Sequence, residues 1–326
     1  MALATRPSTV SAAQAGEAAQ GLAVAVLVPC YNEAPTIAKV VRDFREAIPG
    51  AVVYVFDNNS RDRTVEAALA AGALVRHVPQ QGKGQVVRRM FADVEADIYL
   101  LVDGDDTYAA GHAPALIARL VQGCLDMVVA TRVDDGPHAY RRGHVLGNRL
   151  FTEFVAWLFG RAFTDIFSGY RVFSRRFVKS FPALATGFEI ETELTVHALE
   201  LRMPVDEIPT PYGARPEGSA SKLRTYHDGA RILRTIVRLF QRERPFQFFG
   251  AVSIALAAAA LVLAFPLLLT YLETGLVPRV PTAILASGMM LLAALSATCG
   301  FILDTVTLAR HEMKRLAYLN TPCRWS

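Results

Sequence analysis

Short apolar runs alternate with helical patterns over the first two thirds of the chain. Residues 22–29 form an apolar run that ends at Pro29, which is typical of a strand buried on both faces of a sheet. Residues 35–47 follow with apolar positions at helical spacing, and Pro35 suits the first turn of a helix. The alternation continues with expected strands within 51–57, 73–79, 97–106 and 125–132 and expected helices within 64–72 and 84–95. It predicts an α/β domain with a mainly parallel sheet.

Two uncharged segments occupy much of the C-terminal third. Residues 246–272 and 280–303 contain no Asp, Glu, Lys or Arg. Each is longer than the roughly 20 residues that cross a bilayer core. A pair of buried core helices is the alternative, but uncharged runs of this length are rare in soluble folds. We therefore expect two transmembrane helices within residues 245–305.

Basic residues flank these two segments and predict their orientation. Seven basic and two acidic residues lie between Lys222 and Arg244, and further Lys and Arg residues follow Asp304. The positive-inside rule then places both flanks in the cytoplasm. We expect a multi-pass protein of the inner (cytoplasmic) membrane whose α/β domain faces the cytoplasm, with residues 306–326 as a cytoplasmic tail.

The segment before the first uncharged run has a basic and an apolar side. Within residues 225–244, apolar positions gather on one helical face and arginines on another. Such a helix next to a membrane span is typical of an interfacial helix on anionic lipid, and an ordinary surface helix is the alternative. At the other end of the chain, residues 1–21 lack a continuous apolar core, so we expect a flexible tail rather than a signal peptide.

Composition excludes several classes of protein. Of the 326 residues, 52% are hydrophobic and 20% are charged, which is too apolar for a disordered chain. The net charge of +4 gives no indication of nucleic-acid binding. The four cysteines are scattered without a CxxC pair, so neither a disulfide scaffold nor a zinc site is expected, and a reducing compartment fits.

A cluster of carboxylates follows the expected strand at 97–102. The sequence there is Asp103-Gly104-Asp105-Asp106. Carboxylates at a strand end repel one another unless a cation lies between them, and hard oxygen ligands suit Mg²⁺ or Mn²⁺. Gly104 allows a ligand to approach the backbone closely. A solvated acidic turn is the alternative for this motif taken alone, but it shares a sheet edge with other polar strand ends.

Polar residues also follow the other expected strands. In a parallel sheet the carboxyl ends of the strands meet at the edge where ligands bind. The candidates to contact a nucleotide there are Tyr31, Asn32, Glu33, Asp57, Asn58, Asn59, Ser60 and Asp62. Helix capping is the alternative role, above all for Asp62 before Thr64. Lys83, between two glycines, could place a cation near a phosphate. The chain contains neither a Walker A loop nor a GxGxxG motif. It therefore lacks the residues that define P-loop ATPases and Rossmann-fold dehydrogenases.

Seven motifs in consistent order resemble one known family. They are VPCYNE, FDNNSRDRT, GKG, DGDD, SGYRVFSRR, GFEIETELTVHALE and IPTPYGARPEGSASKL. Together they are similar to family 2 glycosyltransferases, in the branch of dolichol-phosphate mannose synthases and other polyprenyl-phosphate glycosyltransferases. The likeness covers about residues 24–224. It implies a GT-A domain over 22–224, with a nucleotide-sugar donor and Mg²⁺ or Mn²⁺.

The resemblance also implies roles for individual residues. The donor site would contain Pro29, Tyr31, Glu33, Asp57, Asn58, Lys83, Asp103 and Gly104, with Asp103 and Asp105 beside the metal. Arg132, Arg215 and Lys222 would act with Asp105 on the diphosphate. The acceptor phosphate would meet Arg141, Arg149, Arg171 and Ser221. The family commonly has aspartate where this chain has Asn58, which leaves the nucleobase open.

The implied reaction is an inverting, metal-dependent transfer of one sugar from a UDP- or GDP-linked donor to a polyprenyl phosphate such as undecaprenyl or dolichyl phosphate. An acceptor phosphate is already anionic at neutral pH, so a strong general base is less necessary than for a hydroxyl. Glu189 and Glu191 would orient sugar hydroxyls or only favour the dipole of their helix. The alternatives are a transferase for another lipid or glycan, and a membrane-anchored nucleotide-sugar-binding protein without turnover. The expected partners are the donor, the lipid and the membrane, and a homo-oligomer stays open.

Overall fold

The computed structural model describes residues 21–134, 153–154, 157, 163–187, 189–213 and 237–325. These residues divide into two compact units. The first contains the described residues up to 213 together with 314–325, and the second contains residues 237–313. The expected division into an α/β domain and a helical C-terminal part is therefore present, although the last residues of the chain belong to the first unit.

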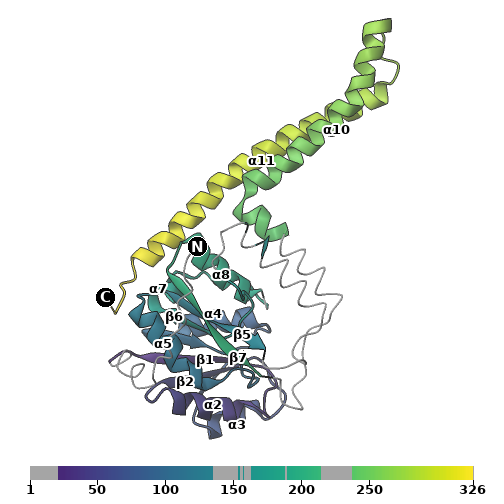
Figure 1. Cartoon of the computed structure of the whole chain (residues 1–326). Helices are drawn as coiled ribbons and strands as arrows, with labels where there is room; N and C mark the ends of the chain where they lie inside the picture. The colour runs from purple at the N-terminus through teal and green to yellow at the C-terminus, as the bar shows by residue number, and fades with distance from the viewer. Residues whose placement is uncertain are drawn as a thin grey trace. The chain divides into compact units, whose positions relative to one another are not determined.

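Seven strands form one sheet in the order β3-β2-β1-β4-β6-β5-β7 (Figure 1). Their bounds are β1 Val24–Cys30, β2 Val52–Asp57, β3 Leu74–His77, β4 Ile98–Leu101, β5 Met127–Asp134, β6 Arg171–Ser174 and β7 Val205–Tyr212. Strand β6 is antiparallel to β4 and β5, whereas the other neighbouring pairs are parallel. The predicted α/β class with a mainly parallel sheet is confirmed.

Both faces of the sheet are covered by apolar side chains of helices. Among the described residues, the helices of this unit are α2 Ile37–Ala47, α3 Thr64–Ala70, α4 Lys83–Asp93, the 3₁₀ turn η1 Ala110–His112, α5 Ala113–Gln122, α7 Arg175–Ser180 and α8 Ile190–Glu200. On one face, Val26 and Val28 of β1 pack with residues of α2 and α5. On the other face, Phe91 of α4 meets the rings of Tyr99 and Phe173 edge-on. Burial on both faces explains the continuous apolar runs of the central strands.

Strand β1 lies at the point where successive strands stop adding to one side of the sheet and begin adding to the other. The chain proceeds from β1 to β2 and β3 on one side, and β4 lies on the other side. The pairing of β1 with β4 ends at Leu27↔Leu101, whereas the pairing with β2 continues to Cys30↔Asp57. Pro29, which lacks an N–H, therefore falls where β4 no longer needs a donor. The loops after β1 and β4 meet at a topological switch point, the usual ligand site of such sheets.

The C-terminal residues are built into the edge of the sheet opposite this switch point. Tyr318 donates to Asp126, just before β5, with 2.8 Å between the oxygens. Arg176 contacts the same carboxylate at 2.5 Å, and its guanidinium lies 5.0 Å from the centre of the Tyr318 ring. Arg324 pairs with Asp97, just before β4, at 3.2 Å. The expected tail, residues 306–326, therefore begins inside α11, and its residues 314–325 belong to the first unit.

Loss of the Tyr318 hydroxyl should destabilise the first unit. The Asp126 side chain is 0% exposed, so a lost hydrogen bond cannot be replaced freely by water. We expect Tyr318→Phe to reduce the free energy of unfolding by about 1.5 kcal/mol or more, because hydrogen bonds to buried charged groups are the strong ones. Thermal unfolding of the full chain in detergent measures this. Tyr271→Phe, at a half-exposed position in the second unit, is the control, and equal midpoints for the two variants would contradict the expectation.

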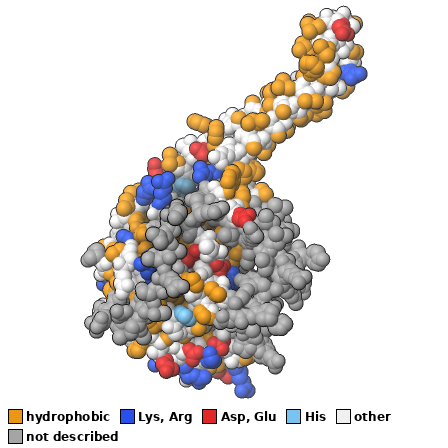
Figure 2. All heavy atoms as spheres, in the orientation of Figure 1, with side chains coloured by type: hydrophobic (Ala, Val, Ile, Leu, Met, Phe, Trp, Pro, Cys, Tyr) orange, Lys and Arg blue, Asp and Glu red, His pale blue; other side chains and the backbone are white. Residues whose placement is uncertain are grey.

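The second unit is a hairpin of two long helices, α10 Pro245–Thr274 and α11 Val280–Leu319, the last turns of α11 lying in the first unit. Both are long and apolar enough to cross a membrane. Figure 2 shows apolar side chains along the visible surface of the hairpin. The expected spans 246–272 and 280–303 lie inside these helices, but α11 continues well beyond residue 303.

The helices run side by side and are joined by hydrogen bonds (Figure 1). Ser253 donates to the Ala293 carbonyl at 2.8 Å, and Ser296 donates to the Phe249 carbonyl at 3.0 Å. Gly300 lies so close to Phe249 that an added Cβ would stand 3.0 Å from the Cβ of that residue. Small residues and hydroxyl hydrogen bonds at the contact are typical of helices packed within a membrane.

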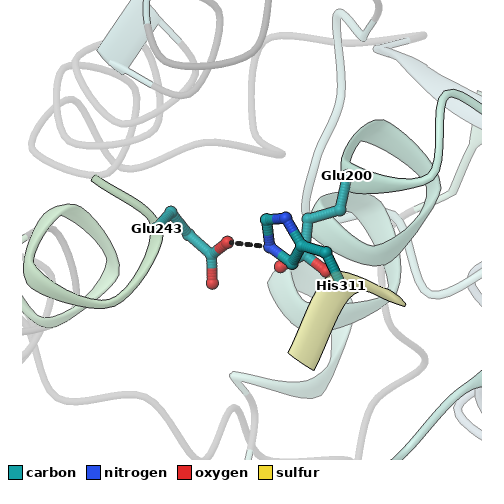
Figure 3. Close-up of side chains that lie close together, drawn as sticks. All are labelled: Glu200, Glu243 and His311. Carbon is teal, nitrogen blue, oxygen red and sulfur yellow. Dashed lines mark hydrogen bonds and ion pairs between the residues drawn. The ribbon is translucent and has the colours of Figure 1, made fainter. Parts of the chain in front are cut away.

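Glu243 lies at the base of the hairpin and is nearly buried. It accepts from Arg310 at 2.9 Å and pairs with His311 at 3.3 Å, as Figure 3 shows for the histidine. Residues 237–243 are helical, which fits the end of the expected interfacial helix 225–244. The rest of that helix, and residues 1–20 of the expected flexible tail, lie outside the described residues.

Candidate active site

Residues Asp103 and Asp105 follow β4 at the switch point. The Asp103 carboxylate is partly exposed, with 28% of its side-chain surface accessible, whereas Asp105 is only 3% exposed. Asp105 accepts from the Thr107 hydroxyl at 2.6 Å and from the Thr107 N–H at 3.3 Å. Thr107 thus fixes one oxygen of this carboxylate. The predicted cluster is a defined structure rather than a solvated turn.

A buried lysine meets the Asp103 carboxylate. Lys83, the first residue of α4, lies 2.6 Å from Asp103 and 2.5 Å from Glu191 of α8. Burial alone would lower the pKa of Lys83, but the two carboxylates outweigh burial and raise its pKa well above the usual range. The lysine is therefore charged at physiological pH. Its predicted role toward the donor stays a prediction, and its present partners are carboxylates.

Two glycines allow the carboxylates to lie so close to the sheet. A Cβ on Gly169 would stand 2.4 Å from Oδ2 of Asp103, and one on Gly104 would stand 2.8 Å from Sγ of Cys30. The N–H of Gly169 donates to the Tyr108 hydroxyl at 3.0 Å. Burial, followed by the nearby Asp103 charge, raises the pKa of this tyrosine, so it remains a neutral phenol. The SGY segment thus forms the wall against which Asp103 rests.

The loops after β1 and β2 are tied together by their polar side chains. The N–H of Asn32 donates to Ser60 at 2.9 Å, and the N–H of Arg61 donates to the Asn32 side chain at 2.8 Å. The N–H of Glu33 donates to Thr64 at 2.9 Å. Asn32 and Asn59 both have positive φ angles, of 55° and 66°. Non-glycine residues in this region are uncommon and gather at functional sites.

The first two strands position their predicted donor residues differently. Asp57 is buried and accepts from the Ser60 N–H at 3.2 Å, and its other oxygen lies 3.1 Å from His77. Tyr31 and Glu33 are partly exposed on the loop after β1, so both can reach a ligand at this edge. Pro29 ends the β1 ladder beside them. The structure brings these residues to one edge, and their contacts with a donor stay predictions.

Asn58 serves its own loop rather than an open pocket. Its amide nitrogen donates to the carbonyls of Val78 and Gln80 at 2.9 and 2.7 Å, and its oxygen accepts from the Gly82 N–H at 2.7 Å. The residue is buried. An aspartate could not donate these two hydrogen bonds. The side chain therefore holds the loop that leads into Lys83, and its expected contact with the nucleoside stays a prediction.

Arg132 is fixed by a carboxylate on a distant loop. Its Nε and Nη2 donate to the two oxygens of Asp165 at 2.7 and 2.8 Å. Burial opposes the charged form of Asp165, but the hydrogen bonds and charge of Arg132 outweigh it and lower the pKa of Asp165. The guanidinium also lies 5.5 Å from the centre of the Tyr212 ring. This paired geometry fixes the plane of the arginine at the sheet edge.

Arg171 does not lie where the sequence led us to expect it. It is 0% exposed, and burial lowers its pKa to about 10. Its guanidinium donates to the carbonyls of Ser168 and Ile166 and to the Thr195 hydroxyl, at 2.9, 2.5 and 2.8 Å. An arginine engaged in this way cannot meet a lipid phosphate. It holds the loop that carries Asp165 and Gly169.

Other predicted residues fall outside the described residues. They are Arg141, Arg149, Arg215, Ser221 and Lys222. Sequence reasoning missed Asp165, Thr107 and the fit of Gly169 against Asp103. The contact of Thr107 could have been predicted, since it comes only two residues after Asp105. The pairing of Arg132 with Asp165 spans 33 residues, so no local pattern indicates it.

The residues at the switch point fit a hard divalent cation. Asp103 pairs with the Lys83 ammonium group at 2.6 Å, so its carboxylate already faces a positive charge. Asp105 adds a second carboxylate on the same turn, and carboxylate oxygens are the ligands that Mg²⁺ and Mn²⁺ prefer.

Comparison with known proteins then decides the family. Residues 25–181 match the family described as glycosyl transferase family 2. The glycosyltransferase AglJ of Haloferax volcanii is 35% identical over 300 residues, which cover 91% of this chain and 98% of AglJ. The chain belongs to glycosyltransferase family 2. The dolichyl-phosphate hexose transferase of the same organism is 28% identical over 222 residues, covering 68% of this glycosyltransferase and 95% of the relative.

Solved structures confirm the expected fold of this glycosyltransferase. Glucosyl-3-phosphoglycerate synthase from Mycobacterium tuberculosis, in complex with Mn²⁺, UDP and glucosyl-3-phosphoglycerate, superposes with a TM-score of 0.61 at 23% identity. The match covers 74% of this chain and 86% of the synthase. The GT-A fold expected from the sequence is thereby confirmed.

Proposed function

We propose that this family 2 glycosyltransferase moves one sugar from a nucleotide diphosphate to the phosphate of a membrane polyprenol. The proposed nucleotide-sugar donor rests on the carboxylate pair Asp103 and Asp105 at the switch point, beside the ends of β1 and β2. The acceptor half rests on the apolar hairpin and on the likeness to a relative named for dolichyl phosphate.

In this reaction the bond between the anomeric carbon and the donor diphosphate breaks, and a bond from that carbon to an acceptor phosphate oxygen forms. The nucleoside diphosphate leaves with the electron pair, and inversion follows if the acceptor attacks from the opposite face. The acceptor phosphate carries its charge before it attacks, so the chain need not supply a strong base. The protein has to orient the two phosphates and stabilise the negative charge that develops.

Named residues of the chain would divide these tasks. Asp103 and Asp105 would hold Mg²⁺ or Mn²⁺, which when bound neutralises charge on the leaving diphosphate. Arg132, fixed by Asp165, presents a planar guanidinium toward the same sheet edge. Tyr31 and Glu33 would contact the nucleoside. Arg215 and Lys222, in the segment before the hairpin, remain our candidates for the lipid phosphate.

The fold of the first unit supports an orientation in the membrane. Because residues 314–325 pack into the same unit as residues 21–213, we expect both parts to lie on one side of the membrane. The chain between them must then cross an even number of times, which agrees with two spans, α10 and α11. With the basic flanks, we place the catalytic domain on the cytoplasmic side of the inner membrane.

A donor and acceptor panel tests the proposed function. The detergent-solubilised full chain is incubated with labelled UDP- and GDP-sugars and undecaprenyl phosphate, with Mn²⁺, with Mg²⁺ and with excess chelator. We expect label in the lipid fraction, with a phosphodiester-linked sugar, for one donor and only with metal. Transfer to undecaprenol diphosphate or diacylglycerol but not to the monophosphate would support a different acceptor, and donor binding without transfer would support a binding protein.

The two-span arrangement predicts a labelling pattern in cells. A cysteine introduced at Thr274, at the end of α10, should react with a membrane-impermeant maleimide added from outside. A cysteine at Ser8 should react only after the membrane is opened. The background for both is a variant whose four native cysteines are replaced by serine. Labelling of both positions from the same side would show that this arrangement is wrong.

A further inference from the structure

We propose that Lys83 is an internal cation that occupies Asp103 before metal binds, and that Glu191 retains this lysine when a divalent cation displaces it. The inference rests on the proposed metal-dependent function. It gives Lys83 and Glu191 a role in positioning charge at the metal site, beyond an ordinary ion pair.

The three side chains form a closely spaced and nearly buried group. Lys83 bridges Asp103 and Glu191 at 2.6 and 2.5 Å. The side chains of Lys83 and Glu191 are only 11% and 7% exposed, whereas that of Asp103 is 28% exposed. Asp103 is therefore the member that faces solvent, and Glu191 is the member on the closed side. A cation that arrives from solvent reaches Asp103 first.

The charges of this group favour displacement of the Lys83 ammonium from Asp103 by a divalent cation. Two carboxylates and one ammonium leave a net charge of −1, so a cation is attracted to the group. A divalent cation on Asp103 would repel the ammonium group from the same carboxylate, since like charges at such distances interact strongly in a partly buried site. Glu191 then provides the counter-charge that keeps Lys83 in the site.

The backbone around the lysine is closely packed, so the proposed exchange involves movement of the side chain. A Cβ on Gly82 would stand 2.2 Å from the Thr186 carbonyl oxygen, and one on Gly84 would stand 2.2 Å from that of Ala185. The start of α4 thus packs directly on the loop that leads into α8. The N–H groups of Leu184 and Ala185 donate to Glu193 of α8 at 3.0 and 2.7 Å.

Asn58 adds a hydrogen bond to this closely packed backbone. Its oxygen accepts from the N–H of Gly82, the residue before Lys83. The start of α4, which carries Lys83, therefore packs on residues 185 and 186, which precede the helix that carries Glu191. The flexible part is the lysine side chain, which can leave Asp103 while its ammonium group remains beside Glu191.

Direct Mn²⁺ titration of the full chain in detergent tests the exchange. The signal of free Mn²⁺ in electron paramagnetic resonance reports affinity without turnover, with and without UDP. Removing the competing cation in Lys83→Met should tighten Mn²⁺ binding by about tenfold or more. Among the described residues, Lys83 pairs with Asp103 and Glu191. Glu191→Gln removes the second of these carboxylate charges, so Lys83 should stay on Asp103 and Mn²⁺ binding should weaken by about tenfold.

A matched control distinguishes displacement of Lys83 by the metal from the general effect of removing a positive charge near the carboxylates. Lys39 pairs with Asp106 at 2.7 Å but does not touch Asp103, and 57% of its side chain is exposed. Lys39→Met also removes one positive charge near the carboxylates, and it should change Mn²⁺ affinity by less than about threefold because the pair is screened by solvent. Equal effects of Lys39→Met and Lys83→Met would overturn the proposal.

A double-mutant cycle gives the decisive comparison. If Glu191 acts by retaining Lys83, Glu191→Gln should lose its effect on Mn²⁺ affinity in the Lys83→Met background. If Glu191→Gln weakened Mn²⁺ binding equally in both backgrounds, Glu191 would act on the metal through its own charge, and the proposed exchange would be overturned. The double variant also removes one charge of each sign, so it keeps the experiment informative if Lys83→Met alone folds poorly. Wild-type protein that binds no Mn²⁺, with or without UDP, would overturn both this inference and the metal role in the proposed function.

Discussion

Replacing Asp105 with asparagine is expected to abolish sugar transfer while the fold remains intact. Asp105 is 3% exposed, and one of its oxygens accepts both hydrogen bonds from Thr107. An asparagine oxygen can accept the same bonds, so the turn is preserved and only the negative charge is lost. Removing a charge that would hold the metal at the leaving diphosphate should lower kcat/KM by about 10³-fold.

The control for this variant separates charge from local structure. Thr107→Val removes the hydroxyl donor at 2.6 Å but leaves the Asp105 carboxylate in place. It should reduce kcat/KM by roughly tenfold at most, because orientation is weakened and the charge is kept. Initial rates over a Mn²⁺ series, together with circular dichroism, measure both variants. If Asp105→Asn retained more than a tenth of the wild-type rate at saturating Mn²⁺, a metal role for this carboxylate would be excluded.

A single methyl group at position 169 is also expected to have a large effect on sugar transfer. An added Cβ would stand 2.4 Å from Oδ2 and 3.1 Å from Oδ1 of Asp103, which is closer than van der Waals contact permits. The short Asp103 side chain, also held by Lys83, would have to rotate or shift. Since a displacement of about 1 Å can cost 10²-fold in rate, we expect Gly169→Ala to lower kcat/KM by about 10²-fold.

Gly111→Ala is the matched control for this steric effect. A Cβ at Gly111 would meet nothing within 4 Å, so this variant should keep wild-type activity. The thermal midpoint of Gly169→Ala should fall only slightly, because its N–H can still donate to Tyr108. Mn²⁺ affinity should fall with activity. Normal Mn²⁺ binding combined with lost activity would show that the methyl group acts on something other than Asp103.

The local pattern of the sequence determined the elements around the site. The apolar runs predicted β1, β2 and β4. The positions of Tyr31, Glu33, Asp103 and Asp105 after these strands then predicted that they lie at one edge of the sheet. This worked because the carboxyl ends of parallel strands must meet at the same side of a sheet. The two long uncharged segments likewise determined α10 and α11, since length and composition alone identify such helices. The four-residue strand β6, antiparallel to its neighbours, had no comparably clear pattern.

Only the tertiary structure decided which polar side chains face a ligand and which support the fold. Arg171 and Asn58 have the residue types of a binding site, yet Arg171 is enclosed by carbonyls of its own loop and Asn58 by those of residues 78–80. Lys83 meets Glu191 across more than a hundred residues of sequence, and Tyr318 meets Asp126 across 192. Composition and spacing describe residues that are near in sequence. Burial and hydrogen bonding depend on residues that become neighbours only when the chain folds, so these roles could not be assigned before the structure was known.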